Sequence, residues 1–309
     1  MFILALFFAP SVKANNCGSD DPIIIPTHNW SSQIVMSRVV GQLLQKAGCN
    51  ITYQSIDSIA VYEAIKNGKV TLELEVWESS FASAFNAALE TGNIIDAGNH
   101  DSVTREDWWY PSYVEELCPG LPDWNALEEC SKIFAKPDSN GKGVYFDGPV
   151  EWQHNNRRIE ALEMNFIVEN VDNPADLWLK LEEAVSKREP IVLYNWSPNF
   201  TDALYGGSFI DFPTYDERCA TDQSWGLNPT MIDDCGSAAG GYLKKAAWHQ
   251  MPEKWPLAYK ILSRVNFNNQ QIGTMAMMVD IDGLTANDAA SQWISQNKKI
   301  WPNWLLVDQ

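Results

Sequence analysis

The first third of the chain alternates short apolar runs with amphipathic stretches. Residues 22–25 form a short apolar run, which is typical of a strand buried on both faces. Ser31 or Ser32 can then cap a helix that ends before Gly48, where a C-terminal glycine belongs. This predicted helix carries its apolar side chains on one face: Ile34, Val35, Val39, Leu43 and Leu44.

The alternation continues and starts again after a loop-rich stretch. A strand over 51–54, a helix over 58–67 and a strand over 72–76 complete a β-α-β-α-β order. Such an order predicts a mostly parallel sheet with right-handed crossovers. Residues 92–142 are predicted as a loop-rich segment. A second α/β series follows, with strands predicted over 144–146 and 191–194 and helices over 156–169 and 175–188.

The last third of the chain predicts helices without strands of their own, over 256–265, 270–279 and 285–299. We expect these helices to return and cover the first sheet, so that the chain crosses twice between two lobes. The predicted fold class is therefore α/β, with two lobes that are each a mostly parallel sheet flanked by helices. The first lobe is predicted over 15–107 and 203–309, and the second over 108–202.

The amino terminus predicts export. Residues 2–9 are an apolar run, and Val12-Lys13-Ala14 resembles a cleavage site, so residues 1–14 are predicted to be a secretory signal, although the basic segment that usually opens one is missing. A membrane span needs roughly 20 apolar residues, and no other stretch comes close. We expect the mature protein to be soluble and periplasmic.

Six cysteines fit an oxidising compartment. Cys118 and Cys130 bracket one short loop, and Cys219 and Cys235 bracket another. The remaining two cysteines, Cys17 and Cys49, precede predicted strands. We predict disulfides with undetermined connectivity rather than zinc, because no pair has C-x-x-C spacing and no histidine lies beside one.

Charge and motifs narrow the function classes. The net charge of −18 argues against binding to nucleic acid or an anionic membrane surface, and a monomer is expected. HExxH, G-x-S-x-G, Walker A and G-x-G-x-x-G motifs are absent, so no catalytic residue, metal or cofactor is predicted. Asp233-Asp234 could help bind calcium, but the pair lacks EF-hand spacing and is more typical of a solvated turn.

Four of the fourteen tryptophans stand at the ends of predicted strands. They are Trp30, Trp77, Trp152 and Trp196. Ligands in open α/β sheets bind outside the carboxyl ends of the strands. Two of these rings belong to each predicted lobe, so a cleft between the lobes would have indole on both sides. Six other tryptophans are expected to fill the core: Trp124, Trp178, Trp255, Trp293, Trp301 and Trp304.

Indole-lined clefts suit a quaternary ammonium ion, whose charge is diffuse and weakly hydrated. Each ring contributes about 0.5–1 kcal/mol in water and about 2 kcal/mol or more when desolvated. Three or four desolvated rings approach the roughly 8 kcal/mol of micromolar binding. A sugar site is the alternative, but the Asp, Asn and Arg side chains that it would want are sparse in the same loops.

Four segments resemble the glycine betaine/choline/carnitine substrate-binding family of ABC transporters, which includes trimethylamine N-oxide binders. The segments are Asn29-Trp30-Ser31, Glu75-Val76-Trp77-Glu78, Trp109-Tyr110-Pro111-Ser112-Tyr113 and the run from Pro190 to Pro198, with Asn195-Trp196-Ser197 inside it. The resemblance covers nearly all of the mature chain. It implies a two-lobed periplasmic fold of the second substrate-binding type and an aromatic cage around a trimethylammonium group.

The resemblance also implies individual site residues. Trp30, Trp77, Trp152 and Trp196 match cage positions, and Trp109 is a further candidate, with Tyr110 as its alternative. Choline-binding relatives carry an Asp two residues after the first cage tryptophan. Ser32 takes that place here, which counts against choline.

The ligand's polar end is predicted less directly. Acidic or neutral side chains flank the cage, namely Glu75, Glu78, Asp147, Glu151 and Asn195, and His154 is the nearby basic candidate. This pattern slightly favours trimethylamine N-oxide over glycine betaine, choline or dimethylsulfoniopropionate. The expected function is a receptor that delivers the osmolyte to an ABC permease. An enzyme acting on methylated amines and a lectin-like sugar receptor are the alternatives from other classes.

Overall fold

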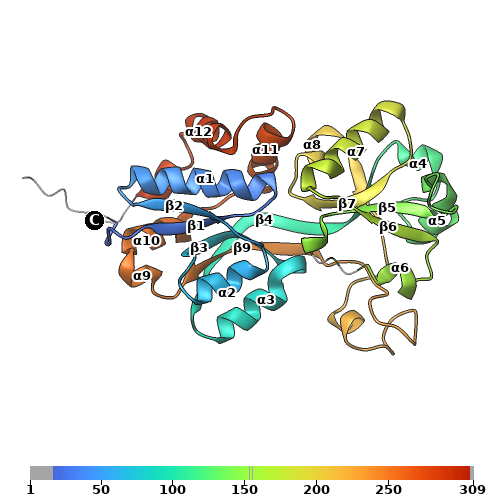
Figure 1. Ribbon diagram of the computed structural model, residues 1–309, viewed down its shortest axis with the longest axis horizontal. Helices are drawn as coiled ribbons and strands as arrows, with labels where there is room; N and C mark the ends of the chain where they lie inside the picture. Colours follow the sequence, from blue (N-terminus) through green and yellow to red (C-terminus); the bar gives the residue numbers. More distant parts are fainter. Residues whose placement is uncertain (1–16, 153, 155, 307–309) are drawn as a thin grey trace, which may run out of the picture.

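The computed structural model describes residues 17–152, 154 and 156–306 of the 309-residue chain. The predicted signal segment, residues 1–14, lies outside the described residues. Two α/β lobes lie side by side and are joined by long strands (Figure 1). The predicted fold class of two α/β lobes is therefore confirmed.

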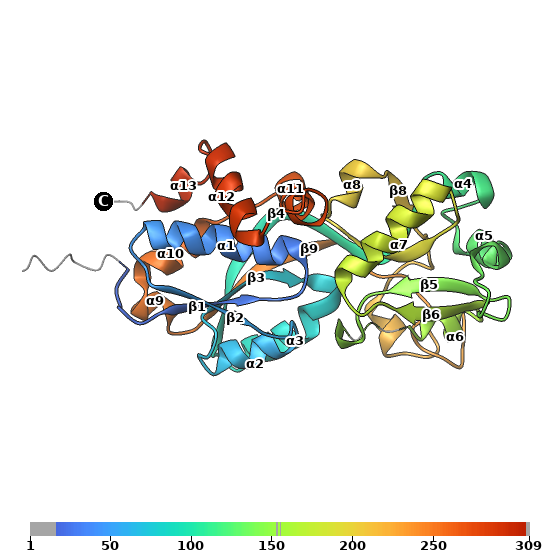
Figure 2. The same ribbon diagram turned by 45° about the horizontal axis from the view of Figure 1, so that its top comes forward.

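The first lobe begins with the predicted order of strands and helices. Its elements are β1 (Ile23–Thr27), α1 (Ser31–Lys46), β2 (Ile51–Ser55), α2 (Ala60–Lys66), β3 (Leu72–Trp77) and α3 (Glu78–Glu90). Strands β1 and β2 pair in parallel. The apolar face of α1 is buried against the sheet, as its helical spacing requires. Helices α2 and α3 cover the opposite face of the sheet (Figures 1 and 2).

Two long strands connect the lobes. Strand β4 (Ile94–Pro111) and strand β9 (Ala239–Trp248) pair antiparallel with each other in a sheet whose order is β3-β9-β4-β7-β5-β6. The far end of β4 pairs with β7 (Val192–Ser197) in the second lobe. The chain thus crosses between the lobes twice, as the sequence predicted.

The second lobe has a parallel core. Strand β5 (Gly143–Asp147) lies between β6 (Phe166–Asn170) and β7, and both pairings are parallel. Its helices are α4 (Val114–Leu117), α5 (Trp124–Glu129), α6 (Arg158–Ala161), α7 (Pro174–Lys187) and α8 (Thr201–Leu204). Short 3-10 helices span Ser131–Phe134, Val150–Trp152 and Glu217–Ala220.

Two predicted segments were wrong, and one strand was missed. The segment 92–142 contains β4, which the sequence hides because Gly98 and polar residues interrupt its apolar pattern and register shifts break its pairing. The predicted helix over 156–169 divides into α6 and strand β6. Strand β9 was missed because its glycines and lysines are unusual in a buried strand. The sheet is consequently more mixed than the mostly parallel one expected, since β9 and β4 pair antiparallel.

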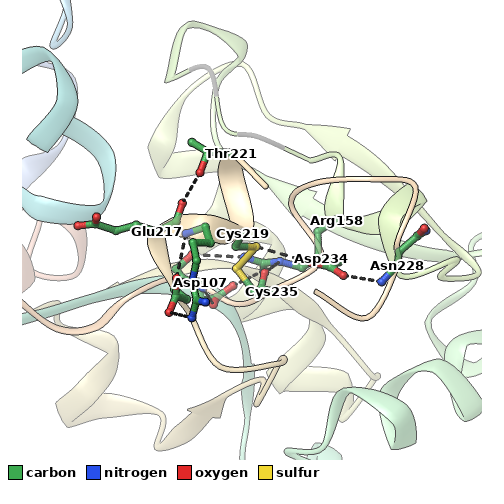
Figure 3. Close-up of a disulfide and its surroundings, with 11 residues drawn as sticks. Asp107, Arg158, Glu217, Cys219, Thr221, Asn228, Asp234 and Cys235 are labelled. Carbon is green, nitrogen blue, oxygen red and sulfur yellow. Dashed lines mark hydrogen bonds and ion pairs between the residues drawn. A yellow bond between two sulfur atoms is a disulfide. The ribbon is translucent and has the colours of Figure 1, made fainter. Parts of the chain in front are cut away.

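The segment after Asp202 stays beside the second lobe before the chain returns. Strand β8 (Gly207–Phe209) pairs with the end of β4 at Trp109–Pro111. The loop closed by Cys219 and Cys235 follows and lies near α6 (Figure 3). The chain then enters the first lobe along β9.

An ion pair between the partly buried Arg158 and the buried Asp107 holds this disulfide loop in place (Figure 3). The Arg158 guanidinium lies 2.6 Å from the Asp107 carboxylate, and it donates a second hydrogen bond to the Cys235 carbonyl at 2.7 Å. The Ser237 amide donates to the other Asp107 oxygen at 2.8 Å. All six cysteines form disulfides, which confirms the prediction of disulfides, and their connectivity is Cys17–Cys49, Cys118–Cys130 and Cys219–Cys235.

The late helices return to the first lobe as expected. They are α9 (Met251–Lys254), α10 (Pro256–Arg264), α11 (Asn269–Asp280), α12 (Ala286–Gln296) and α13 (Pro302–Leu305). Helices α11 and α12 pack beside α1 (Figures 1 and 2). Within the described part of the chain, none of the helices has both the length and the apolar composition to span a membrane.

Trp293 is a purely structural tryptophan of this helical layer. It is 1% exposed, and its ring stacks on Trp304 at 6.0 Å and meets the Phe267 ring edge-on at 5.4 Å. We predict that Trp293→Ala lowers the free energy of unfolding by about 3–5 kcal/mol, because it leaves a large cavity. Chemical denaturation measures the loss, with the half-buried Trp301→Ala as a milder comparison. A loss below about 1 kcal/mol would contradict this packing role.

Candidate functional site

A cavity of about 370 Å³, including its open mouth, lies where the two lobes meet. It is lined by Trp30, Trp77, Ser80, Phe81, Glu106, Trp152, His154, Tyr194 and Trp196. The structure thus brings together four of the five tryptophans that the sequence singled out.

The four tryptophans reach the cavity because each lies at or near the carboxyl end of a strand. Trp30 lies between β1 and α1, at the N-cap position of α1 and without a capping hydrogen bond from its side chain. Trp77 ends β3 where α3 begins. Trp152 ends the 3-10 helix that follows β5, whereas Trp196 lies within β7, one residue before its end. The carboxyl ends of the strands form the binding edge of an open α/β sheet.

The indole rings approach one another across the junction of the lobes. Trp30 of the first lobe and Trp152 of the second meet edge to face, with centroids 6.3 Å apart and an angle of 89°. Trp152 in turn meets Trp196 at 5.6 Å and 75°. The Trp152 indole also donates a hydrogen bond of 2.9 Å to Asn29 of the first lobe. Aromatic contacts and a hydrogen bond therefore span the junction directly.

Trp109 and Tyr110 lie outside the cavity. The Trp109 ring is buried beneath β8, where a Cβ at Gly207 would come within 2.1 Å of it. The Tyr110 hydroxyl donates to Glu115 at 3.1 Å. Side chains alternate between the two faces of β4, and the residue of this strand that lines the cavity is Glu106.

Glu106 supplies the carboxylate of the cavity lining, and nothing in the sequence pattern marked it as a site residue. It lies within β4, in a stretch that showed no strand pattern and no motif. Its Oε1 accepts hydrogen bonds from Ser80 at 2.6 Å and Tyr194 at 2.8 Å, and its Oε2 accepts one from Ser79. Burial raises the pKa of Tyr194 well above its usual range, so this phenol remains a donor.

His154 is another polar residue of the lining, and it pairs with Asp147. His154 lies 2.6 Å from the fully buried Asp147 carboxylate and packs against Tyr194 with centroids 4.0 Å apart. Asp147 also accepts hydrogen bonds from the Gly148 amide and the Asn156 side chain. The contacts with Asp147 and Tyr194 thus hold His154 in place. His154 is the basic candidate that was predicted near the cage.

Glu75 lies directly behind the two tryptophans of the first lobe. Its Oε2 accepts hydrogen bonds from the indole N–H groups of Trp30 at 2.7 Å and Trp77 at 3.0 Å. Ser32 donates to the same oxygen at 3.3 Å. Burial raises the pKa of Glu75 to about 7, although these hydrogen bonds act in the opposite direction.

A second buried pair lies behind Glu75. His28 contacts the Glu73 carboxylate at 2.8 Å and stacks on Trp30 with centroids 4.9 Å apart. Burial is the largest single effect and lowers the pKa of His28. The charge and hydrogen bond of Glu73, the Ile56 carbonyl and the charge of Glu75 together outweigh burial and raise that pKa. No group of three or more His, Cys, Asp or Glu residues suited to hold a metal occurs among residues 17–152, 154 and 156–306.

Comparisons with known proteins agree with this architecture. The family model of the substrate-binding domain of ABC-type glycine betaine transport systems (OpuAC) matches residues 21–296. A trimethylamine N-oxide-binding protein from Pelagibacter ubique (strain HTCC1062) is 42% identical over 296 residues, which cover 93% of this chain and 92% of the relative.

Solved structures show the same fold at low sequence identity. Lactococcal OpuAC, in a closed form with glycine betaine, matches with a TM-score of 0.70 and 14% identity, over 93% of this chain and 100% of that one. An ABC-transporter choline-binding protein in complex with choline matches with a TM-score of 0.70 and 15% identity, over 94% of this chain and 92% of that one.

The chain belongs to the family of ABC-type glycine betaine substrate-binding domains, as its sequence motifs predicted. Members of this family are the substrate-binding components of transporters and are not enzymes. The expectation of a binding protein without catalytic activity is confirmed at the level of the family.

The buried carboxylate behind the cage predicts a pH-dependent stability. The folded state keeps the Glu75 proton up to about pH 7, whereas an ordinary glutamate releases it near 4.5. The folded state therefore binds more protons in this window, and the free energy of unfolding should fall as pH rises through it, by about 3 kcal/mol from this group. The raised pKa values of His28 and Asp280 act in the same direction.

Chemical denaturation between about pH 5 and about pH 8 measures this decline, and the Glu75→Gln variant should show a shallower one. Parallel curves for the two proteins would show that Glu75 does not hold a proton in the folded state.

Proposed function

We propose that this protein is a periplasmic receptor that binds a methylated ammonium osmolyte and delivers it to an ABC permease. Trimethylamine N-oxide is the preferred ligand, ahead of glycine betaine, choline and dimethylsulfoniopropionate. The observation that carries the proposal is the convergence of Trp30, Trp77, Trp152 and Trp196, two from each lobe, on one cavity.

The indole faces favour a bulky cation over a small hydrated one. A trimethylammonium group spreads its charge over its methyl groups and loses little hydration when it enters an apolar cavity. Each desolvated ring contributes about 2 kcal/mol, so four rings reach the roughly 8 kcal/mol of micromolar binding. Trp30, Trp77 and Trp196 are each less than a tenth exposed, which provides the water-poor surroundings that this estimate assumes.

Glu106 favours a ligand whose oxygen can carry a proton. A protonated N-oxide or the hydroxyl of choline could donate to its carboxylate, whereas the carboxylate of glycine betaine would meet a like charge there. Ser80 and Tyr194, which already donate to Glu106, fix its position. The identity of 42% with a trimethylamine N-oxide-binding protein supports the same order of preference.

The lobes and the location of the protein are part of this proposal. Among the described residues, we place the first lobe at 17–107 and 239–306 and the second at 108–238, because β8 pairs with the second-lobe end of β4 and the return crossing is β9. This replaces the boundary expected at residue 203. Export guided by residues 1–14 is supported by the three disulfides, which persist in an oxidising compartment.

Substitution of the cage tests the proposed ligand class. We predict that trimethylamine N-oxide at 100 times its Kd raises the free energy of unfolding by about 2.7 kcal/mol. Trp77→Ala and Trp196→Ala should each abolish this stabilisation, because each removes one wall of the cavity. Trp301→Ala, which changes a tryptophan outside the cavity, is the matched control and should keep it.

A thermal-shift screen with trimethylamine N-oxide, glycine betaine, choline, carnitine and dimethylsulfoniopropionate provides the measurement. Unchanged binding in both cage variants would mean that the ligand binds elsewhere. Stabilisation by sugars instead would favour the lectin-like alternative, and turnover of a methylated amine would favour an enzyme.

Glu106 provides a separate test of the ligand's polar end. We predict that Glu106→Gln weakens binding of trimethylamine N-oxide by at least about tenfold, because a hydrogen bond to a charged group is lost. The affinity for glycine betaine should stay the same or rise, because the like charge is removed. Isothermal titration calorimetry measures both, with the exposed Glu115→Gln as control. An equal loss for the two ligands would refute this discrimination.

A further inference from the structure

One carboxylate oxygen holds both tryptophans that the first lobe contributes to the cavity. Glu75 Oε2 accepts the indole hydrogen bonds of Trp30 and Trp77, and these two rings come from separate elements, the start of α1 and the end of β3. The same oxygen atom therefore fixes the side-chain conformation of both tryptophans.

The Glu75 carboxylate has no cationic partner in the described part of the chain. Its side chain is almost fully buried, at 1% exposure, and its Oε1 lacks a hydrogen-bond partner among the described residues. A buried charge without a partner is costly. Such a group is retained where its charge is used, and the cavity in front of the two rings is where a cation would bind.

We propose that Glu75 is a positioning residue that also supplies countercharge: it fixes the Trp30 and Trp77 rings and strengthens their attraction for a cation in the cavity. This inference rests on the proposed function, since it requires that the cavity binds a methylated ammonium group. It assigns to a residue outside the cavity lining a share of the selectivity for charge.

Two physical effects act together here. Hydrogen bonds from the indoles to an ionised carboxylate are charge-assisted, and they polarise each ring so that its face becomes more negative. The carboxylate also attracts the cation directly through a medium of low dielectric. An uncharged ligand of the same shape gains from neither effect. Glu75 should therefore discriminate between a cation and its neutral isostere.

The ionisable neighbours Glu73 and His28 pair with each other, so the protonation of Glu75 can respond to a ligand. Glu73 lies two residues earlier on the same strand, and its charge disfavours ionisation of Glu75. His28, from the segment between β1 and α1, is already paired with Glu73. The pKa of Glu75 is about 7, so a bound cation would lower it and release a proton. Affinity for a cation should therefore rise with pH through this value.

The Glu75→Gln variant separates charge from shape. The amide oxygen can take the place of Oε2 and keep accepting from both indoles, while the amide nitrogen takes the place of the unpartnered Oε1. Two probes of similar size distinguish the effects: tetramethylammonium, which is charged and does not titrate, and tert-butanol, which is uncharged. The exposed Glu183→Gln on α7 removes the same unit of charge at a distant site.

We expect Glu75→Gln to weaken tetramethylammonium binding by about tenfold at pH 8, measured by calorimetry, and to leave tert-butanol binding unchanged. Wild-type affinity for tetramethylammonium should rise between about pH 6 and about pH 8, and this dependence should vanish in the variant. Glu183→Gln should resemble the wild type. The free energy of unfolding of Glu75→Gln at pH 8 should not be lower than that of the wild type, because the cost of a buried charge is removed.

Several results would overturn the inferred role of Glu75. Equal loss for both probes, or an unchanged affinity and pH profile in Glu75→Gln, would overturn the inference. If this variant does not fold, calorimetry of the wild type in two buffers of different ionisation enthalpy replaces it, and binding of tetramethylammonium at pH 7 without proton release would overturn the inference. A wild type that binds none of the methylated osmolytes would instead overturn the proposed function.

Discussion

Aromatic faces attract a cation strongly only where water is excluded, and one lobe cannot exclude it alone. Trp30 and Trp77 belong to the first lobe, whereas Trp152 and Trp196 belong to the second. The crossing strands β4 and β9 set how these halves can meet, and the hydrogen bond from Trp152 to Asn29 joins them at the junction. The fold therefore serves to bring weak individual attractions into one desolvated space.

Acidic groups inside the protein complement the rings at a cost in stability. Glu106 lines the cavity, Glu75 lies behind two of its walls, and Glu73 is paired with His28 further back. Burial of such groups is unfavourable unless they are hydrogen-bonded, and each of these carboxylates accepts several hydrogen bonds. The acidic residues of the chain are thus not confined to its surface, since Glu73, Glu75 and Glu106 are buried around the cage.

The sequence predicted the parts of the molecule that follow local rules. Tryptophans at strand ends identified four cavity residues, because the carboxyl ends of strands converge on one edge of a sheet. Trp109 does not line the cavity, because its side chain packs under β8. The pairing of β8 with β4 joins distant segments, and no local pattern reveals it. Glu106 was missed for the same kind of reason: it became a cavity residue only through the pairing of β4 with β7, and β4 itself carries glycine and polar residues that hide it.

The most direct test of the cage is a crystal structure of the protein with trimethylamine N-oxide. We expect the ligand nitrogen to lie within about 6 Å of the ring centroids of Trp30, Trp77, Trp152 and Trp196, the range of cation–π contacts. The ligand oxygen should lie within hydrogen-bonding distance of Glu106. A ligand bound away from these rings, or a trimethylammonium group that faces solvent while the cavity stays closed, would contradict the account.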